Sequence, residues 1–172
     1  MTRNGNWFAF GLVSVLSAGV GFLSRGVIAG EEPAQVKPID GHALVKALSG
    51  SWTTKATSTM GAVTGHATFG LECGKTILAT RYEQKFSAGE VQGLGVLEIS
   101  ADGKTATQWV FDSMMEGVLM MTGPITDAGY TIEGSNKMGS SKMTLTKKGD
   151  GFEMKTWADG AEFMTETYTK AK

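Results

Sequence analysis

The sequence has little cysteine, histidine and proline, and these shortages exclude several kinds of structure and site. Cys73 is the single cysteine among 172 residues, so no intrachain disulfide can form. The two histidines, His42 and His66, have no recognised metal-ligand spacing with Cys73, and a structural zinc site needs three or four ligands. We therefore expect no metal and no cofactor. The net charge of −1 provides no basic surface of the kind that nucleic-acid binding requires.

Motifs for catalysis and phosphate binding are also missing. No Gly-x-Ser-x-Gly nucleophile elbow occurs, and the glycines lie between expected strands rather than ahead of a helix. No His or Asp adjoins Cys73 to activate its thiol. The 17 acidic residues show no spacing that marks a catalytic pair. We find no catalytic set and leave open whether the chain is an enzyme.

The N-terminal segment has the features of an export signal. Arg3 precedes an uncharged apolar run over residues 7–23, and Val27-Ile28-Ala29 offers a cleavage site after Ala29. Residues 1–29 are therefore expected to be a signal peptide, or alternatively an uncleaved anchor, of a periplasmic or secreted protein. Residues 30–39 form an expected linker, and residues 40–172 form the folded domain. No other membrane segment is expected.

Hydrophobic periodicity predicts one helix followed by many strands. The helix is expected over residues 41–49, with Asp40 as its N-cap and Leu44, Val45 and Leu48 as its buried face. From Trp52 onward, apolar residues alternate with polar ones in ten short runs separated by turns. The runs are 52–60, 63–69, 76–86, 91–99, 105–112, 118–122, 130–135, 142–147, 152–157 and 161–169. Closing such a sheet removes its edges, so we predict an all-β, antiparallel, up-and-down barrel of about ten strands.

Several stretches resemble known proteins. Gly50-Ser51-Trp52 resembles the Gly-x-Trp signature of lipocalin-like barrels, with Gly50 and Trp52 as structural residues at the closed end. Further stretches, over about residues 43–170, resemble a bacterial family of often exported proteins described only as a domain of unknown function. These stretches are 93–97, 107–114, 123–134 and 165–170. The resemblance implies a lipocalin-like, calycin-type barrel and no established activity.

The sequence also departs from what the resemblance implies. The family's usual Gly-Tyr-Asp, after the glycine-rich strand, is replaced here by residues 98–102. Some short lipocalin-like barrels bind haem through a histidine near their C-terminal strands, but no histidine follows His66. Haem binding is therefore not expected.

Methionine is the abundant residue that bears on function. Nine methionines follow residue 29, and flexible, polarisable methionine side chains suit pockets that accept varied apolar guests. Arg81 either points inward to a ligand carboxylate or points outward and pairs with Glu83 or another neighbour. Met114 and Met115 are expected to form a flap at one mouth or a contact with a partner. The candidate ligand-binding residues are Arg81, Tyr82, Trp109, Phe111, Met120, Tyr130, Met154 and Phe163.

Two functional hypotheses follow. In the first, the barrel is hollow and binds a small hydrophobic or amphipathic molecule. In the second, the barrel is filled, and the protein is an interaction or structural module of the cell envelope. A continuous cavity of about 300 Å³ or more would favour the first. The sequence leaves the oligomeric state open.

Overall fold

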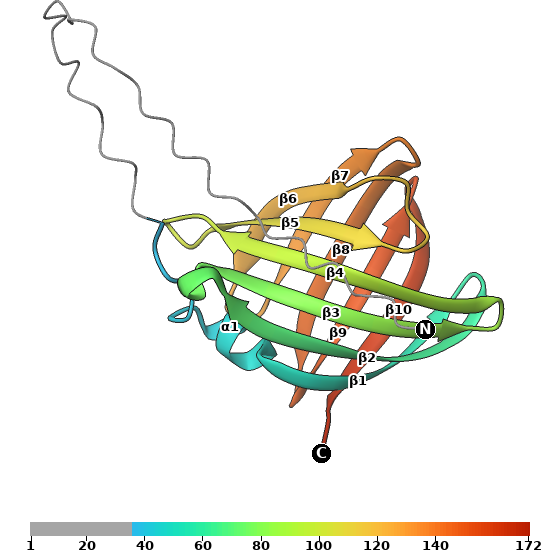
Figure 1. Ribbon diagram of the computed structural model, residues 1–172, viewed down its shortest axis with the longest axis horizontal. Coiled ribbons are helices and arrows are strands. Elements are labelled where there is room, and N and C mark those ends of the chain that lie inside the picture. The colour runs from blue at the N-terminus through green and yellow to red at the C-terminus, as the bar shows by residue number, and fades with distance from the viewer. Residues whose placement is uncertain (1–35) are drawn as a thin grey trace, which may run out of the picture. The chain divides into compact units, whose positions relative to one another are not determined.

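The computed structural model describes residues 36–172, which form one short helix and ten strands (Figure 1). The expected signal peptide lies outside these residues. No helix within the described range is long and apolar enough to cross a membrane. The elements are α1 (Ala43–Leu48), β1 (Gly50–Ser58), β2 (Gly61–Glu72), a 3-10 turn (Cys73–Lys75), β3 (Ile77–Phe86), β4 (Gly89–Ile99), β5 (Thr105–Asp112), β6 (Leu119–Thr126), β7 (Gly129–Asn136), β8 (Gly139–Lys148), β9 (Gly151–Ala158) and β10 (Ala161–Lys170).

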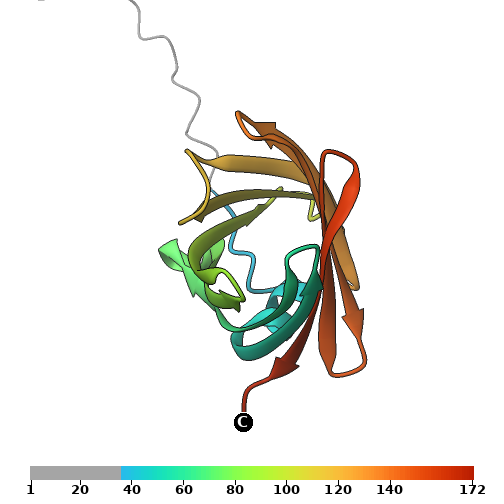
Figure 2. The same ribbon diagram turned by 90° about the vertical axis from the view of Figure 1, so that its right-hand side faces the viewer.

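The strands close into a single barrel. Each strand pairs antiparallel with the next along the chain, and β1 pairs with β10, so the sheet has no open edge. Figure 2 shows the strands arranged as a ring. All ten expected strands are present, and the predicted up-and-down antiparallel barrel with one short N-terminal helix is confirmed.

The helix α1 lies at one end of the barrel (Figure 1), and buried side chains close that end. Trp52 is 2% exposed, and its indole N–H donates to the Leu48 carbonyl over 2.7 Å. The Phe152 ring meets the Trp52 ring edge-on, with centroids 5.3 Å apart. The Lys170 ammonium lies 4.5 Å from the Trp52 ring centroid and donates to the Ser49 carbonyl. Trp52 is therefore a structural residue of the closed end.

The helix itself differs from expectation at its start. It begins two residues later than predicted, and His42 is the N-cap, since its Nδ1 accepts the Leu44 N–H over 3.3 Å. The prediction of Asp40 as the cap was wrong because its carboxylate pairs with Lys75 at 3.0 Å instead. Ile39, at the end of the expected linker, is buried, and its N–H donates to the Lys75 carbonyl.

Candidate functional site: a methionine-lined cavity

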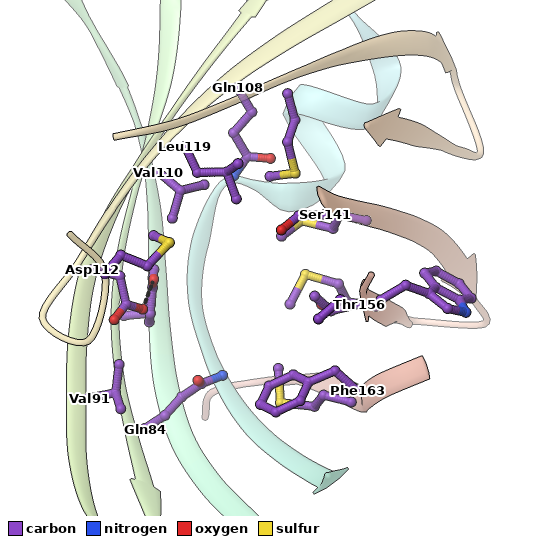
Figure 3. A pocket seen from close by; sticks show the side chains of 18 of the residues that line it. Gln84, Val91, Gln108, Val110, Asp112, Leu119, Ser141, Thr156 and Phe163 are labelled. Carbon is purple, nitrogen blue, oxygen red and sulfur yellow. Dashed lines mark hydrogen bonds between the residues drawn. The ribbon is translucent and has the colours of Figure 1, made fainter. Parts of the chain in front are cut away.

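A cavity of about 360 Å³ lies inside the barrel (Figure 3), and its lining residues place its opening at the end opposite α1. Its outermost lining residues lie at the hairpins and strand ends of that far end. They include Met60 between β1 and β2, Phe86 at the end of β3, Met114 after β5, and Met138 between β7 and β8. Because the turns of an up-and-down barrel alternate between its two ends, these residues form one mouth. The helix closes the other end.

Methionine side chains dominate the lining. Eight of the ten methionines of the chain face the cavity: Met60, Met114, Met115, Met121, Met138, Met143, Met154 and Met164. Exposure falls from the mouth inward, from 59% at Met138 and 57% at Met114 to 1% at Met121. A register shift between Glu162 and Met164 lets the neighbouring Phe163 and Met164 both reach the cavity. The wall is therefore apolar, polarisable and able to change rotamer.

A row of three residues across β3, β4 and β5 builds the polar group at the mouth. Tyr82 lies opposite Gly93, which in turn lies opposite Asp112. The Tyr82 ring covers Gly93, and its hydroxyl donates to Asp112 Oδ2 over 2.6 Å. The other oxygen of Asp112 accepts the Met114 N–H over 2.7 Å. Burial, followed by the hydrogen bond to the Asp112 carboxylate, raises the pKa of Tyr82, so the phenol stays a donor.

A second carboxyl group, Glu166 on β10, is wholly buried beside the cavity. Its oxygens accept a hydrogen bond from Gln84 Nε2 at 2.7 Å and one from the Tyr168 hydroxyl at 2.8 Å. Burial raises the pKa of Glu166, and these hydrogen bonds oppose that rise only in part. Gln84 and Tyr168 line the cavity and separate Glu166 from it. Glu166 therefore fixes the orientation of two wall residues.

A third polar contact lies further along the wall. The Tyr130 hydroxyl donates to Gln108 Oε1 over 3.4 Å, and it also lies 3.7 Å from the Met143 sulfur. Burial raises the pKa of Tyr130, which keeps this phenol neutral as well. The interior thus combines an apolar wall with a few hydrogen-bonding groups, which is typical of small-molecule sites.

The structure brings four of the eight predicted ligand-binding residues to the cavity: Tyr82, Tyr130, Met154 and Phe163. Arg81 was a wrong candidate, because it is exposed on the outer face and its Nη1 pairs with Glu72 at 3.3 Å. The outward alternative was correct, although the partner is not the suggested Glu83.

Trp109, Phe111 and Met120 were also wrong candidates, since they lie on the outer face of β5 and β6. Phe111 is 43% exposed and Met120 is 52% exposed. Val118, just before β6, is 44% exposed as well. In these strands the alternate residues point inward, namely Gln108, Val110, Asp112, Leu119 and Met121.

Sequence reasoning missed Gln84, Gln108, Asp112 and Glu166. The sequence signal that could have identified them is their position, since each alternates along its strand with residues that face outward. Glu166, for example, lies two residues from both Met164 and Tyr168, which face the cavity. Within residues 36–172, no three His, Cys, Asp or Glu side chains gather as metal ligands, and Cys73 is exposed.

Comparison with known proteins identifies the family of this chain and finds similar solved structures. The sequence model of a family described as "Protein of unknown function (DUF1579)" matches residues 37–170. No curated protein matches significantly.

Two solved structures of designed proteins are similar at 14% sequence identity. A de novo designed fluorescence-activating β-barrel has a TM-score of 0.47, and the match covers 75% of this chain and 98% of the designed one. A redesigned β-barrel, mFAP1, bound to DFHBI, has a TM-score of 0.45, and that match covers 74% and 99%. The description of the barrel rests on its own strand pairing rather than on these two likenesses.

Proposed function

The chain belongs to the DUF1579 family, whose description assigns no function, and we propose that it binds a small hydrophobic or amphipathic molecule inside its barrel. The observation that carries this proposal is the cavity of about 360 Å³ with its lining of eight methionines. A guest would enter at the methionine-rich mouth and exchange water for the apolar wall. The phenol, amide and carboxylate groups of the wall would then orient it.

The alternative of a completely filled barrel is less well supported by the packing. The closed end has large side chains in contact, such as Trp52 with Phe152. Toward the mouth, Met114 and Met138 remain more than half exposed although they line the cavity. A barrel whose interior served stability alone would gain by burying these side chains.

We further propose that the protein works outside the cytoplasm. This rests on the signal-peptide features of residues 1–29, namely Arg3 and the apolar run that follows it. Analysis of the N-terminus of protein from its native cells, in separated cell fractions, would test both export and cleavage after Ala29.

A blocked cavity tests the binding proposal. In Thr156→Trp a bulky ring enters the cavity from β9, whereas in Lys155→Trp the same ring lies on the outer face of that strand. We expect a fluorescent apolar probe such as N-phenyl-1-naphthylamine to bind the natural protein and Lys155→Trp, and to lose affinity for Thr156→Trp. Circular dichroism would establish that both variants fold.

Native mass spectrometry of protein from its source provides an independent readout, since a guest carried through purification appears as added mass. The proposal fails if the natural protein binds no probe and carries no guest. It also fails if Thr156→Trp binds the probe as well as Lys155→Trp does.

A further inference from the structure

The charge of the cavity wall has one sign. Among the lining residues none is Lys, Arg or His, and Asp112 is the one that carries a formal charge at neutral pH. The six ion pairs within residues 36–172 join other residues and leave Asp112 without a cationic partner. Its two hydrogen-bond donors, the Tyr82 hydroxyl and the Met114 N–H, are neutral. The wall therefore holds an uncompensated carboxylate.

The Asp112 carboxylate can accept more hydrogen bonds than the two that Tyr82 and Met114 donate to it. Two oxygens offer about four acceptor sites, and Tyr82 and Met114 use two of them. Asp112 is half-buried at the last residue of β5, next to the mouth. A cationic group bound there would keep part of its hydration, so its transfer from water costs less than full burial would.

The buried polar groups Gln84 and Glu166 add acceptors rather than cations. Gln84 uses its amide N–H to bind Glu166, which leaves its carbonyl oxygen as the free end of the side chain. Glu166 lies directly behind it as a second carboxyl group. An anionic guest would thus meet the Asp112 carboxylate and the Gln84 carbonyl oxygen, with Glu166 behind Gln84 and no wall cation to balance its charge.

Aromatic faces near the mouth also suit a cation. Tyr82, Phe86 and Phe163 line the cavity, whereas the Trp157 ring already has the Lys142 ammonium 5.7 Å from its centroid. A cation over the face of such a ring is attracted by the negative charge of the π electrons, the more so where the site excludes water. Lys137, in the turn between β7 and β8, is an exposed cation near the mouth but is not a lining residue.

Building on the function proposed above, we propose that the preferred guest is a hydrophobic amine. Its protonated amino group donates hydrogen bonds to Asp112 at the mouth, and its apolar body lies among the methionine side chains. The same wall discriminates against fatty acids and other hydrophobic anions, because it offers them no positive charge.

Three guests that share one chain length but differ in head group test this proposal: decylamine, decanol and decanoic acid, titrated calorimetrically near pH 7. We expect decylamine to bind about tenfold more tightly than decanol, as one charge-assisted hydrogen bond at a half-buried site would give. Decanoic acid should bind more weakly than decanol. The advantage of decylamine over decanol should shrink as salt is added.

Asp112→Asn removes the charge and keeps the shape, so it should bring decylamine to the affinity of decanol. Glu116→Gln is the matched control, since it removes a carboxylate from the loop after β5 that does not line the cavity. The control should keep the tenfold preference. If Asp112→Asn does not fold, the head-group series and its salt dependence in the natural protein still decide the matter.

The outcomes separate this inference from the broader proposal. If none of the three guests binds and the apolar probe does not bind either, the proposed function itself fails. If decanol binds but decylamine has no advantage, or decanoic acid binds most tightly, the amine inference is overturned and binding of apolar guests stands. An amine preference that survives Asp112→Asn also overturns it.

Discussion

Alanine at Gly93 tests whether this glycine allows the polar group at the mouth to form. Gly93 stands between Tyr82 and Asp112 in one cross-strand row, and the Tyr82 ring lies over it to reach Asp112. A Cβ at position 93 would overlap the Cζ and hydroxyl oxygen of Tyr82. Gly93→Ala therefore displaces the ring and breaks the 2.6 Å hydrogen bond to Asp112.

Three contributions set the size of the effect. Overpacking costs about 1–3 kcal/mol, and loss of a hydrogen bond to a charged group costs about 1.5 kcal/mol at the lower end, which suits a half-buried pair. Replacing glycine by alanine in a strand returns about 0.4–1 kcal/mol through the unfolded chain. Together these contributions predict that Gly93→Ala lowers the free energy of unfolding by about 1.5–4 kcal/mol.

A double-mutant cycle with Tyr82→Ala isolates the cause. Without the Tyr82 ring, Gly93→Ala should stabilise slightly, so the coupling energy in urea unfolding is the overpacking cost plus the hydrogen-bond cost, about 2.5–4.5 kcal/mol. Gly95→Ala, on the same strand, is the control. Its Cβ would meet the Gln108 amide nitrogen at 3.0 Å, in a side chain that can move, and Thr80 Cβ at 3.5 Å, an ordinary contact. Equal costs of Gly93→Ala with and without Tyr82 would refute the reasoning.

Three further predictions concern Trp52 at the closed end, the buried carboxyl group of Glu166 and the methionines at the mouth. Trp52→Phe loses the hydrogen bond to Leu48 and some core volume, so thermal or urea unfolding should show a loss of about 2–3 kcal/mol, with probe affinity unchanged. Burial raises the pKa of Glu166 in the folded protein above its value in the unfolded chain. The folded protein therefore holds this proton more tightly. The resulting stabilisation is complete below the unfolded-state pKa and is lost as the pH rises through the folded-state pKa. Glu166→Gln should abolish that fall in urea titrations between about pH 4 and pH 8. Mild peroxide should weaken probe binding in step with sulfoxide formation, mapped by mass spectrometry, at the exposed mouth residues Met60, Met114 and Met138.

The closed end could be predicted from the sequence because several local signals agree there. The spacing of Leu44, Val45 and Leu48 fits one helical face, and all three are buried. Gly50 leaves the helix with φ of 115°, a value that glycine adopts readily, and Trp52 follows on the first inward position of β1. Alternation from that point onward was strong enough to count ten strands.

The lining of the cavity could be predicted only in part, because alternation groups residues without saying which group faces inward. In β5 the large aromatic residues Trp109 and Phe111 share one face, and Gln108 and Asp112 share the other. Size and hydrophobicity favoured the aromatic face as the interior. The structure has the opposite arrangement. The cavity holds polar groups that hydrogen-bond one another, such as Tyr82 with Asp112 and Tyr130 with Gln108. The outer face of the barrel wall is in water, where exposed apolar side chains are common.

The two ends of the barrel differ in whether their side chains matter mainly for stability or mainly for affinity, and this difference follows from side-chain chemistry. At the closed end, Trp52 and Phe152 are stiff, fully packed rings, so substitutions there leave voids and cost stability. At the mouth, Met114 and Met138 are flexible and already half in water, so trimming them removes little buried surface. Substitutions of these exposed methionines should therefore change affinity with little loss of stability, while substitutions of Trp52 and Phe152 do the reverse. A cavity that served only to fill the barrel would not show this separation, because every lining residue would then contribute mainly to stability.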